Sequence, residues 1–368
     1  MKAHGLLLLA LCTVAAAAQS VSIRPEVLTR ELEHPWAIAF IGNDRMLVTE
    51  RPGRMRVVQA DGKLEPPLAG VPKVEVGGQG GLLDLITDRD FAHNRAIYFC
   101  YVEPGSSSGT STIALATAHL PEDAKRLEQV KVLFSAKPQV KGNLNLGCRV
   151  VDNGDGTLFL SVGDRFTHMD DAQKLDSDLG KIIRIHKDGS IPPDNPFVNR
   201  KSARPEIWSY GHRNPQGMTL GPDGKLWIDE HGPQGGDEIN RPEAGKNYGW
   251  PVITYGENYG GGKIGEGITA KEGMEQPLHY WTPSIAPSGM AFLLNDKYGK
   301  AWKGSLFVGS LKFRYLDRIE LRGNKVVKEE KLLQDRKQRI RDVRVGRDGL
   351  IYVLTDEEKG ELIRLRPE

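Results

Sequence analysis

One short phrase recurs along the chain and limits the folds that it can adopt: an apolar strand, a polar turn often spelled Asp-Gly, then a second strand. Glycine accepts the positive φ of a tight hairpin turn, and aspartate bonds its own turn backbone. Successive copies start roughly 45 to 75 residues apart, a spacing typical of blades of four strands. The sequence therefore predicts an all-β, six-bladed β-propeller, with blades starting at Ala37, Leu82, Arg149, Gly217, Gly289 and Arg341.

Helical periodicity is almost absent, and only residues 121–132 and 173–179 predict a helical turn or two. No linker rich in Ser, Gly or Pro divides the chain, so we expect residues 19–368 to form a single propeller domain. A pair of β-sandwiches is the competing architecture. In a propeller, the long Gly/Pro-rich loops should gather on one face around a central pocket; these loops are residues 77–81, 137–148, 163–177, 232–259, 311–314 and 338–342.

The N-terminus has the pattern of a secretory signal peptide. Lys2 precedes an apolar run that ends in small residues, so we expect residues 1–18 to be cleaved after Ala18 and the product to be periplasmic or secreted. Cys12 follows a bulky leucine, unlike a lipid-attachment cysteine. No later stretch is long enough to cross a bilayer, so no integral membrane segment is expected after cleavage.

The two other cysteines, Cys100 and Cys148, lie in no CxxC or Cys/His ligand pattern. We expect both to be small buried hydrophobic residues, and their pairing is left open because spacing does not determine it. With 50 basic and 48 acidic residues the net charge is +2, which gives no support to nucleic-acid binding.

Basic residues mark the ends of several predicted blades. Arg339 and Arg341 flank Ile340, and on a strand both guanidiniums would point to one side. Arg213 and Lys312 occupy comparable positions. Four cations that converge on one pocket predict an anionic ligand, and one with several carboxylates would suit them because guanidinium matches carboxylate geometry. Surface ion pairing is the alternative for each residue taken alone.

Acids and histidines supply further candidates. Asp237 and Glu238, with nearby carbonyls, are compatible with a calcium site, because Ca²⁺ prefers oxygen ligands in irregular loops. The glycine-rich segment 77–81 lacks the lysine of a phosphate loop and is interpreted as a tight loop that presents Gln79 to a ligand. Five histidines in loop contexts are candidate general bases, each more often structural: His34, His168, His212, His231 and His279.

The residues also resemble a known family, the glucose/sorbosone dehydrogenases, and within it the soluble aldose sugar dehydrogenases that use pyrroloquinoline quinone (PQQ). The resemblance runs along most of the chain, in the motifs HPWAIAF, GGQGGLLDL, LFLSVGDR, IPPDNPF, EIWSYGHRNPQGM, DEHGPQGGDEIN, GKNYGWP, PSGMAF and QRIRDV. It implies a six-bladed propeller that oxidises aldoses at C1 to lactones, with hydride transfer to PQQ, dependence on Ca²⁺, and an external electron acceptor.

The resemblance also implies roles for particular residues. It implies quinone-cofactor contacts from Gln79, Arg213, Asn214, Tyr259, Lys312, Arg339 and Arg341. It implies calcium ligands in the backbone carbonyls of Gly232 and Pro233, and in Glu238 and Tyr248 for a further calcium ion. Asp164 corresponds to the acid beside the family's catalytic histidine.

The chain departs from the family at that histidine. The run anchored on Arg149 is Asn-Leu-Gly-Cys-Arg, so Asn145 stands where the general base is expected. An amide does not accept a proton at neutral pH as imidazole does, and loss of a general base typically costs about a hundredfold to ten-thousandfold in rate. Asp164 and His168 are candidate substitutes.

Three functions therefore stay open: a periplasmic PQQ- and Ca²⁺-dependent aldose dehydrogenase that is active or weakly active, a catalytically inactive propeller that binds PQQ or sugar, and a Ca²⁺-dependent lactone hydrolase. The hydrolase requires a metal with an open coordination position in the central channel.

Overall fold

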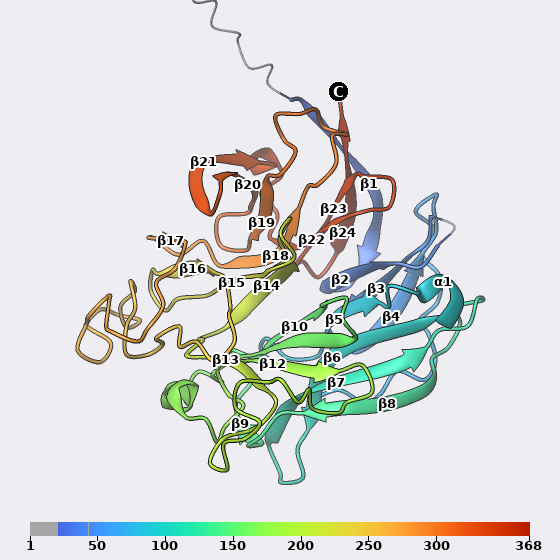
Figure 1. Cartoon of the computed structure of the whole chain (residues 1–368). Helices are drawn as coiled ribbons and strands as arrows, with labels where there is room; N and C mark the ends of the chain where they lie inside the picture. Colours follow the sequence, from blue (N-terminus) through green and yellow to red (C-terminus); the bar gives the residue numbers. More distant parts are fainter. Residues whose placement is uncertain (1–20, 43) are drawn as a thin grey trace, which may run out of the picture.

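The protein forms a ring of antiparallel sheets. The computed structural model describes residues 21–42 and 44–368, which are built almost entirely from β-strands. Six sheets surround a common centre (Figure 1). Their innermost strands contact one another in ring order; these are β2 (Pro35–Phe40), β5 (Leu82–Thr87), β10 (Gly147–Asp152), β14 (Pro215–Leu220), β18 (Pro287–Phe292) and β22 (Ile340–Val345). The predicted six-bladed propeller is confirmed, and all six predicted blade starts lie in these strands.

The outer strands complete each blade. In blade order they are β3 (Met46–Glu50) and β4 (Arg54–Val58); β6 (Ala96–Pro104), β7 (Thr110–His119) and β8 (Glu128–Ser135), with β9 (Val140–Lys141) beside β7; β11 (Thr157–Val162), β12 (Lys181–His186) and β13 (Ile207–Tyr210); β15 (Leu226–Glu230), β16 (Asp237–Asn240) and β17 (His279–Trp281); β19 (Leu306–Ser310), β20 (Tyr315–Arg322) and β21 (Lys325–Leu332); β23 (Ile351–Thr355), β24 (Gly360–Pro367) and β1 (Ile23–Leu32).

The first strand of the described chain closes the ring. β1 pairs antiparallel with β24, with Ile23 opposite Pro367, so the sixth blade contains both ends of the described sequence (Figure 1). The Glu368 N–H also donates to the Ser22 carbonyl at 3.0 Å. Because β1 precedes the first recurrent phrase, the blade pattern alone did not predict this pairing.

The Asp-Gly turns have the geometry expected from their residues. Gly224 and Gly349 have φ of 72° and 79°, where a side chain would be strained. In both turns the preceding aspartate accepts a hydrogen bond from the residue after the glycine, at 3.2 Å for Asp223 and 3.1 Å for Asp348. The innermost strands that precede these two turns, β14 and β22, are buried along their first four residues.

The two helical predictions were wrong. Residues 121–132 form a turn and the start of β8, because Val130 and Val132 alternate with Lys131 and the strand finds backbone partners on β7. Residues 173–179 lie after the 3₁₀ helix η1 (Met169–Gln173) and overlap it at one residue. The other helical elements are α1 (Phe91–Asn94) and η2 (Gln334–Arg336).

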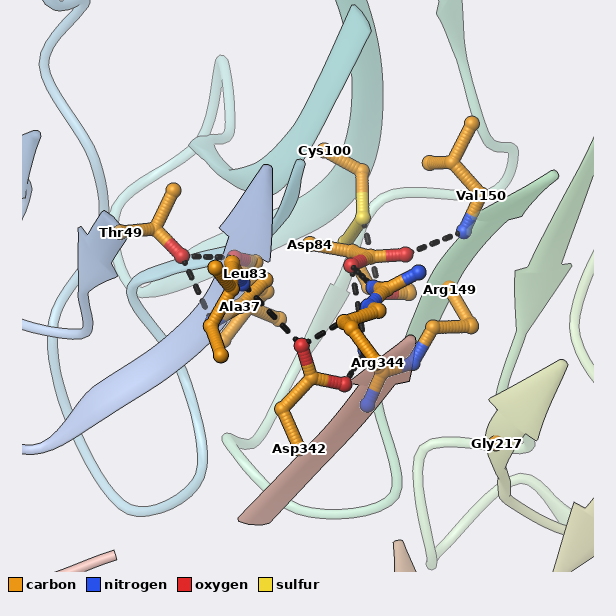
Figure 2. Close-up of polar contacts among 12 residues, drawn as sticks. Ala37, Thr49, Leu83, Asp84, Cys100, Arg149, Val150, Gly217, Asp342 and Arg344 are labelled. Atoms are coloured by element: carbon orange, nitrogen blue, oxygen red, sulfur yellow. Dashed lines mark hydrogen bonds and ion pairs between the residues drawn. A yellow bond between two sulfur atoms is a disulfide. The ribbon is translucent and has the colours of Figure 1, made fainter. Parts of the chain in front are cut away.

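A buried ion-pair network joins the innermost strands of blades 2, 3 and 6 (Figure 2). Arg149 Nη1 lies 3.1 Å from Asp84 Oδ1 and 2.8 Å from Asp342 Oδ1. Arg344 contacts the same two carboxylates, at 2.5 Å and 2.9 Å. The opposing carboxylates raise the pKa of Arg344, although burial alone would lower it. Because two cations satisfy two anions, these carboxylates are already neutralised at the centre of the ring.

Cys100 on β6 and Cys148 on β10 are fully buried, as predicted, and they are joined by a disulfide between blades 2 and 3. The predicted signal peptide, residues 1–18, lies outside the described residues. Within the described residues, no helix has the length and apolar character needed to cross a membrane.

Candidate active site

All six blades contribute to one central cavity of about 430 Å³. It is lined by Trp36, Arg51, Gln79, Leu83, Leu146, Gly147, Gln216, His231, Ala286, Leu311, Lys312, Arg314, Arg339, Arg341 and Asp356. This volume suits a small-molecule ligand. A cavity of about 660 Å³ lies elsewhere, against residues 106–110, 135–139 and 171–177. We place the chemistry in the central cavity because charged side chains from three blades, the first, fifth and sixth, line it.

The central cavity carries an excess of positive charge. Five cations line it and one carboxylate, Asp356, opposes them. Arg339 Nη2 and Arg341 Nη2 lie 3.1 Å and 2.7 Å from Asp356 Oδ2. Burial alone would raise the pKa of Asp356, but the two guanidiniums hold it well below its usual range. Lys312 forms no ion pair with any described residue. The predicted convergence of Lys312, Arg339 and Arg341 is therefore present, without one acid for each cation.

The alternation of Arg339, Ile340 and Arg341 works as the sequence predicts. Both arginines line the cavity, while Ile340 is fully buried in the apolar core of blades 1, 5 and 6. Strand geometry thus brings two guanidiniums to one wall of the cavity.

Arg213 lies beside the central cavity rather than in its lining. Its Nη1 donates to the carbonyls of His231 at 3.1 Å and Gly232 at 2.8 Å, and its Nη2 lies 3.4 Å from Tyr259 Oη. The guanidinium carbon is 5.3 Å from the centre of the Trp250 ring. No described carboxylate pairs with Arg213, and Trp250 orients the charge by cation–π contact.

Several buried donors near the cavity have no partner among the described residues. They are Nε of Arg213, Nε of Arg341 and Nδ2 of Asn214. Asn214 itself is fixed, because its Oδ1 accepts from the Gly147 N–H at 3.0 Å. A buried donor without a partner costs free energy, so these groups fit a ligand rich in oxygen acceptors.

Asn145 is held by Asp164 and Gln79. Its Nδ2 donates to Asp164 Oδ1 at 2.9 Å, and its backbone N–H donates to Gln79 Oε1 at 2.8 Å. Asp164 also accepts from the Phe166 N–H at 2.7 Å and from Trp250 Nε1 at 2.8 Å. Burial raises the pKa of Asp164, while Arg213 and these donors act in the opposite direction.

These contacts fix the orientation of the amide. Three donors face Asp164, so the nitrogen side of Asn145 turns towards it and Oδ1 faces away. Asn145 Oδ1 accepts no hydrogen bond from a described residue. It is available to accept a hydrogen bond from a ligand hydroxyl, but it does not take the proton. Asp164 is fully buried, which removes it from direct contact with a ligand.

Glu238 faces a second carboxylate in a small cavity beside Arg213. The cavity measures about 10 Å³ and is lined by Glu230, Glu238 and Tyr248 among others. Burial, and next the charge of Glu230, raises the pKa of Glu238 to about 8. The pKa of Glu230 is lowered despite its burial, because His212 and other donors stabilise its charge. Two acids in such proximity fit an oxygen-ligated cation.

The available oxygens define which ligands such a cation could use. The Tyr248 hydroxyl already bonds the Arg241 carbonyl and the Glu243 N–H, so only its carbonyl is free to coordinate. The Gly232 carbonyl accepts from Arg213, which uses one of its two lone pairs. Residues 21–42 and 44–368 contain no group of three or more His, Cys, Asp or Glu side chains arranged to hold a metal. A calcium site here would depend on carbonyls.

Asp237 does not join Glu238 in one site, which corrects the expectation from their adjacency. Its carboxylate accepts from the Gly232 N–H at 2.8 Å, Ser284 Oγ at 2.9 Å and the Ala286 N–H at 2.8 Å. Successive side chains on β16 point to opposite faces, so Asp237 supports a loop while Glu238 lines the small cavity.

The histidines offer no replacement base. Of the five candidates only His231 lines the central cavity, and burial lowers its pKa to about 3, with its Nε2 2.7 Å from the Pro287 carbonyl. His212 is fully buried between Ser209 and Glu230. His168 lies 3.8 Å from Asp171. His34 and His279 likewise face acids, Asp356 and Glu329.

Sequence reasoning missed several residues of the site. Trp36 lines the cavity, and its ring packs on Arg149 with the guanidinium carbon 4.2 Å from the ring centre. Trp250 bonds Asp164, and Asp356 is the counter-ion of the arginine pair. The two tryptophans occur in the motifs HPWAIAF and GKNYGWP, a signal that was present in the sequence.

Comparison with known proteins shows the family to which the chain is related. The family model described as glucose/sorbosone dehydrogenase matches residues 32–364. The chain belongs to this family. The resemblance found in the motifs is thereby confirmed, and with it the class of enzyme, a sugar dehydrogenase.

Named relatives and solved structures agree with the family. The aldose sugar dehydrogenase YliI of Escherichia coli strain K12 is 46% identical over 355 residues, which cover 95% of this chain and 94% of that protein. The apo crystal structure of the soluble E. coli aldose sugar dehydrogenase matches with a TM-score of 0.91 and 45% identity, over 94% of this chain and 100% of that one. The PQQ-bound aldose sugar dehydrogenase of Streptomyces coelicolor matches with a TM-score of 0.75 and 27% identity, over 95% and 100%.

Proposed function

We propose that this protein is a periplasmic or secreted aldose dehydrogenase that oxidises sugars at C1 to lactones, with PQQ as its cofactor and Ca²⁺ bound beside it. The observation that carries the proposal is the central cavity, which Lys312, Arg339 and Arg341 line from two blades, and where the two arginines share the single carboxylate Asp356 and Lys312 has no ion pair with a described residue. PQQ is a flat molecule with several carboxylates, and a related structure holds it.

The donor set fits this cofactor. Buried, unpartnered nitrogens of Arg213, Asn214 and Arg341 need acceptors, and carboxylate and quinone oxygens supply them. Gln79 and Tyr259 complete the predicted contacts, although Gln79 already bonds Asn145 and Tyr259 is 62% exposed. When bound, PQQ supplies the chemistry of accepting a hydride from the sugar.

The chain's own contribution to the reaction is to hold and orient the sugar. The Asn145 amide oxygen accepts a hydrogen bond from the C1 hydroxyl, and Asp164 and Trp250 keep that oxygen in place. The Asn145 amide does not accept the proton of the C1 hydroxyl, and none of the histidines replaces it as a base. The hydroxyl proton therefore passes to water. We therefore expect slower turnover than with a histidine at this position.

Calcium would be held by residues of the small cavity and its neighbouring loop. Glu238 and the Tyr248 carbonyl fit one ion, with Glu230 as a further carboxylate, and the carbonyls of Gly232 and Pro233 fit a second ion that contacts the cofactor. The raised pKa of Glu238 supports this assignment, because a cation relieves the repulsion between the two acids.

The test is reconstitution. The purified protein, loaded with PQQ and Ca²⁺, should reduce a dye acceptor when an aldose is added, and the lactone should be recovered in proportion to the dye reduced. A loaded protein that shows no turnover beside an active family member would contradict the enzymatic proposal.

A second function is favoured by Asn145: a propeller that binds PQQ or sugar without turnover. It predicts tight cofactor binding and no lactone. The lactone hydrolase receives no such support, because Asp84 and Asp342, the carboxylates at the centre of the ring, are already paired with Arg149 and Arg344.

A further inference from the structure

Four cations and one aromatic ring form a distinct surface at the mouth of the central cavity. We call it the basic rim; it consists of Arg51, Lys312, Phe313, Arg314 and Lys337. Arg51, Lys312 and Arg314 line the mouth, and Arg314 Nη1 donates to the Lys337 carbonyl at 3.3 Å, which brings Lys337 into the same surface. Lys312, Arg314 and Lys337 are exposed, and Arg51 is half-buried.

None of these four cations forms an ion pair with a described residue. Arg51 and Arg314 donate to backbone carbonyls, at 2.8 Å to Gly78 and 3.3 Å to Lys337. Lys325 is exposed too, but it lies at the start of β21, whereas Arg51, Lys312 and Arg314 line one cavity. Unpaired like charges at one mouth repel each other, so they favour an anionic partner.

The cofactor accounts for only part of this charge. The proposed cofactor contacts use Lys312 together with the arginines inside the cavity, whereas Arg314 is not one of these contacts and exposed Lys337 lies outside the lining. A ligand wholly inside the cavity would leave Lys337 without an anionic partner, so its charge is available to a partner outside the cavity.

Phe313 gives the basic rim an apolar centre. It is 45% exposed. Its ring stacks on buried Tyr315 with centroids 6.4 Å apart, and Lys312 Nζ lies 5.4 Å from the Phe313 ring centre. The ring is thus anchored to the core on one side and open to solvent on the other. Aromatic residues surrounded by charge are typical of protein interfaces.

The surface lies where electrons must leave. This step rests on the proposed function: oxidation of an aldose to its lactone releases two electrons and two protons, and the protons pass to water. A one-electron carrier removes the two electrons in two successive encounters, and each carrier is reduced by one electron. Short-lived redox complexes have small interfaces that electrostatics steer together.

We infer that the basic rim is the docking surface for an acidic one-electron carrier protein that reoxidises the enzyme. Phe313 packs against the partner, and Arg314 and Lys337 steer its acidic face to the mouth of the cavity. The interaction weakens as salt rises, because the charges are exposed.

Direct binding tests the inference independently of turnover. The probe is a c-type cytochrome of low isoelectric point, with one of high isoelectric point as its counterpart, measured by surface plasmon resonance at low and at physiological salt. The test variant is F313A/K337E in the PQQ-loaded protein. The matched charge control is K325E, an exposed lysine at the start of β21 in the hairpin with β20. We expect the acidic cytochrome to bind, and the test variant to weaken binding roughly tenfold or more. K325E should leave binding unchanged.

Three results would overturn the inference: no binding of the acidic cytochrome, equal binding of both cytochromes, or equal binding by F313A/K337E and the wild type. A fourth result would also overturn the inference: F313A/K337E slows reduction of a small anionic acceptor but leaves binding of the cytochrome unchanged. The basic rim would then serve small anionic acceptors. A neutral dye should be reduced equally by wild type and F313A/K337E. If the wild type reduces no dye, the proposed function fails, while the binding result still decides the surface.

Discussion

Replacing Asn145 by histidine should raise the turnover of the PQQ- and Ca²⁺-loaded protein. The backbone is ready for the change, because Asn145 has φ of 49° and histidine is among the residues that adopt this region. Asp164 Oδ1, now 2.9 Å from the amide nitrogen, would accept the N–H of the new imidazole. The other ring nitrogen would then face the ligand with a free lone pair.

The size of the gain follows from the role of the new base. General-base catalysis contributes about a hundredfold to ten-thousandfold, or about 3 to 5 kcal/mol of barrier. We expect kcat for an aldose to rise by about a hundredfold or more, with the affinity for PQQ unchanged. The rate should also acquire an ionisation near the imidazole pKa, raised from its usual value by Asp164.

The assay is steady-state dye reduction across pH, with PQQ affinity measured separately. The control is the double variant N145H/D164N, which keeps the ring and loses the carboxylate that orients it; most of the gain should disappear. Equal kcat in N145H and the wild type, with cofactor bound in both, would refute the explanation of weak activity by Asn145.

Three further perturbations test other parts of the structure. Ca²⁺ at a hundred times its Kd should increase the free energy of unfolding of the wild type by about 3 kcal/mol, which is measured as a higher melting temperature. The variant E238Q should lose most of this increase. An equal increase in E238Q would show that Glu238 is not a calcium ligand. D84A should destabilise the fold by about 3 to 5 kcal/mol in denaturant unfolding, because it leaves Arg149 and Arg344 buried with one carboxylate between them; a loss below 1 kcal/mol would contradict this. Asp88 has its pKa lowered to about 2, because hydrogen bonds led by that from Lys187 outweigh its burial. Its charge therefore stabilises the fold by about 2 kcal/mol above pH 4, and this is lost as pH falls towards 2. The difference in stability between D88N and wild type should vanish over that range, and a difference independent of pH would be inconsistent with it.

The blades could be predicted from sequence because each repeats a local signal. An apolar run and an Asp-Gly turn fix strand, turn and strand within a few residues, as at Asp223 and Gly224. The closing strand β1 and the short helices carry no such repeat, so their positions depend on tertiary pairing. The helix expected within 121–132 failed for the same reason, since pairing with β7 overrode a weak local preference.

Site residues could be predicted from the sequence where strand alternation, or position in a family motif, determines which way a side chain points. Arg339 and Arg341 reach the cavity because strand geometry requires it. The partners of these residues were not predictable, because they come from distant segments. Asp356 meets Arg341 from 15 residues along the chain, and Trp250 meets Asp164 from 86 residues away. The spacing of the cysteines in the sequence likewise did not determine that Cys100 pairs with Cys148.

The most direct test of the account is to measure the affinity of the apo-protein for PQQ by isothermal titration calorimetry in the presence of Ca²⁺. The wild type is compared with R339Q/R341Q. If cations from separate blades hold a multiply acidic cofactor, the wild type should bind one equivalent with Kd at or below about 1 µM. Binding should weaken with salt, and R339Q/R341Q should weaken it by about a hundredfold or more, in line with loss of two charged hydrogen bonds. Equal affinity in the two proteins, or no binding by the wild type at a hundred times that concentration, would contradict the account.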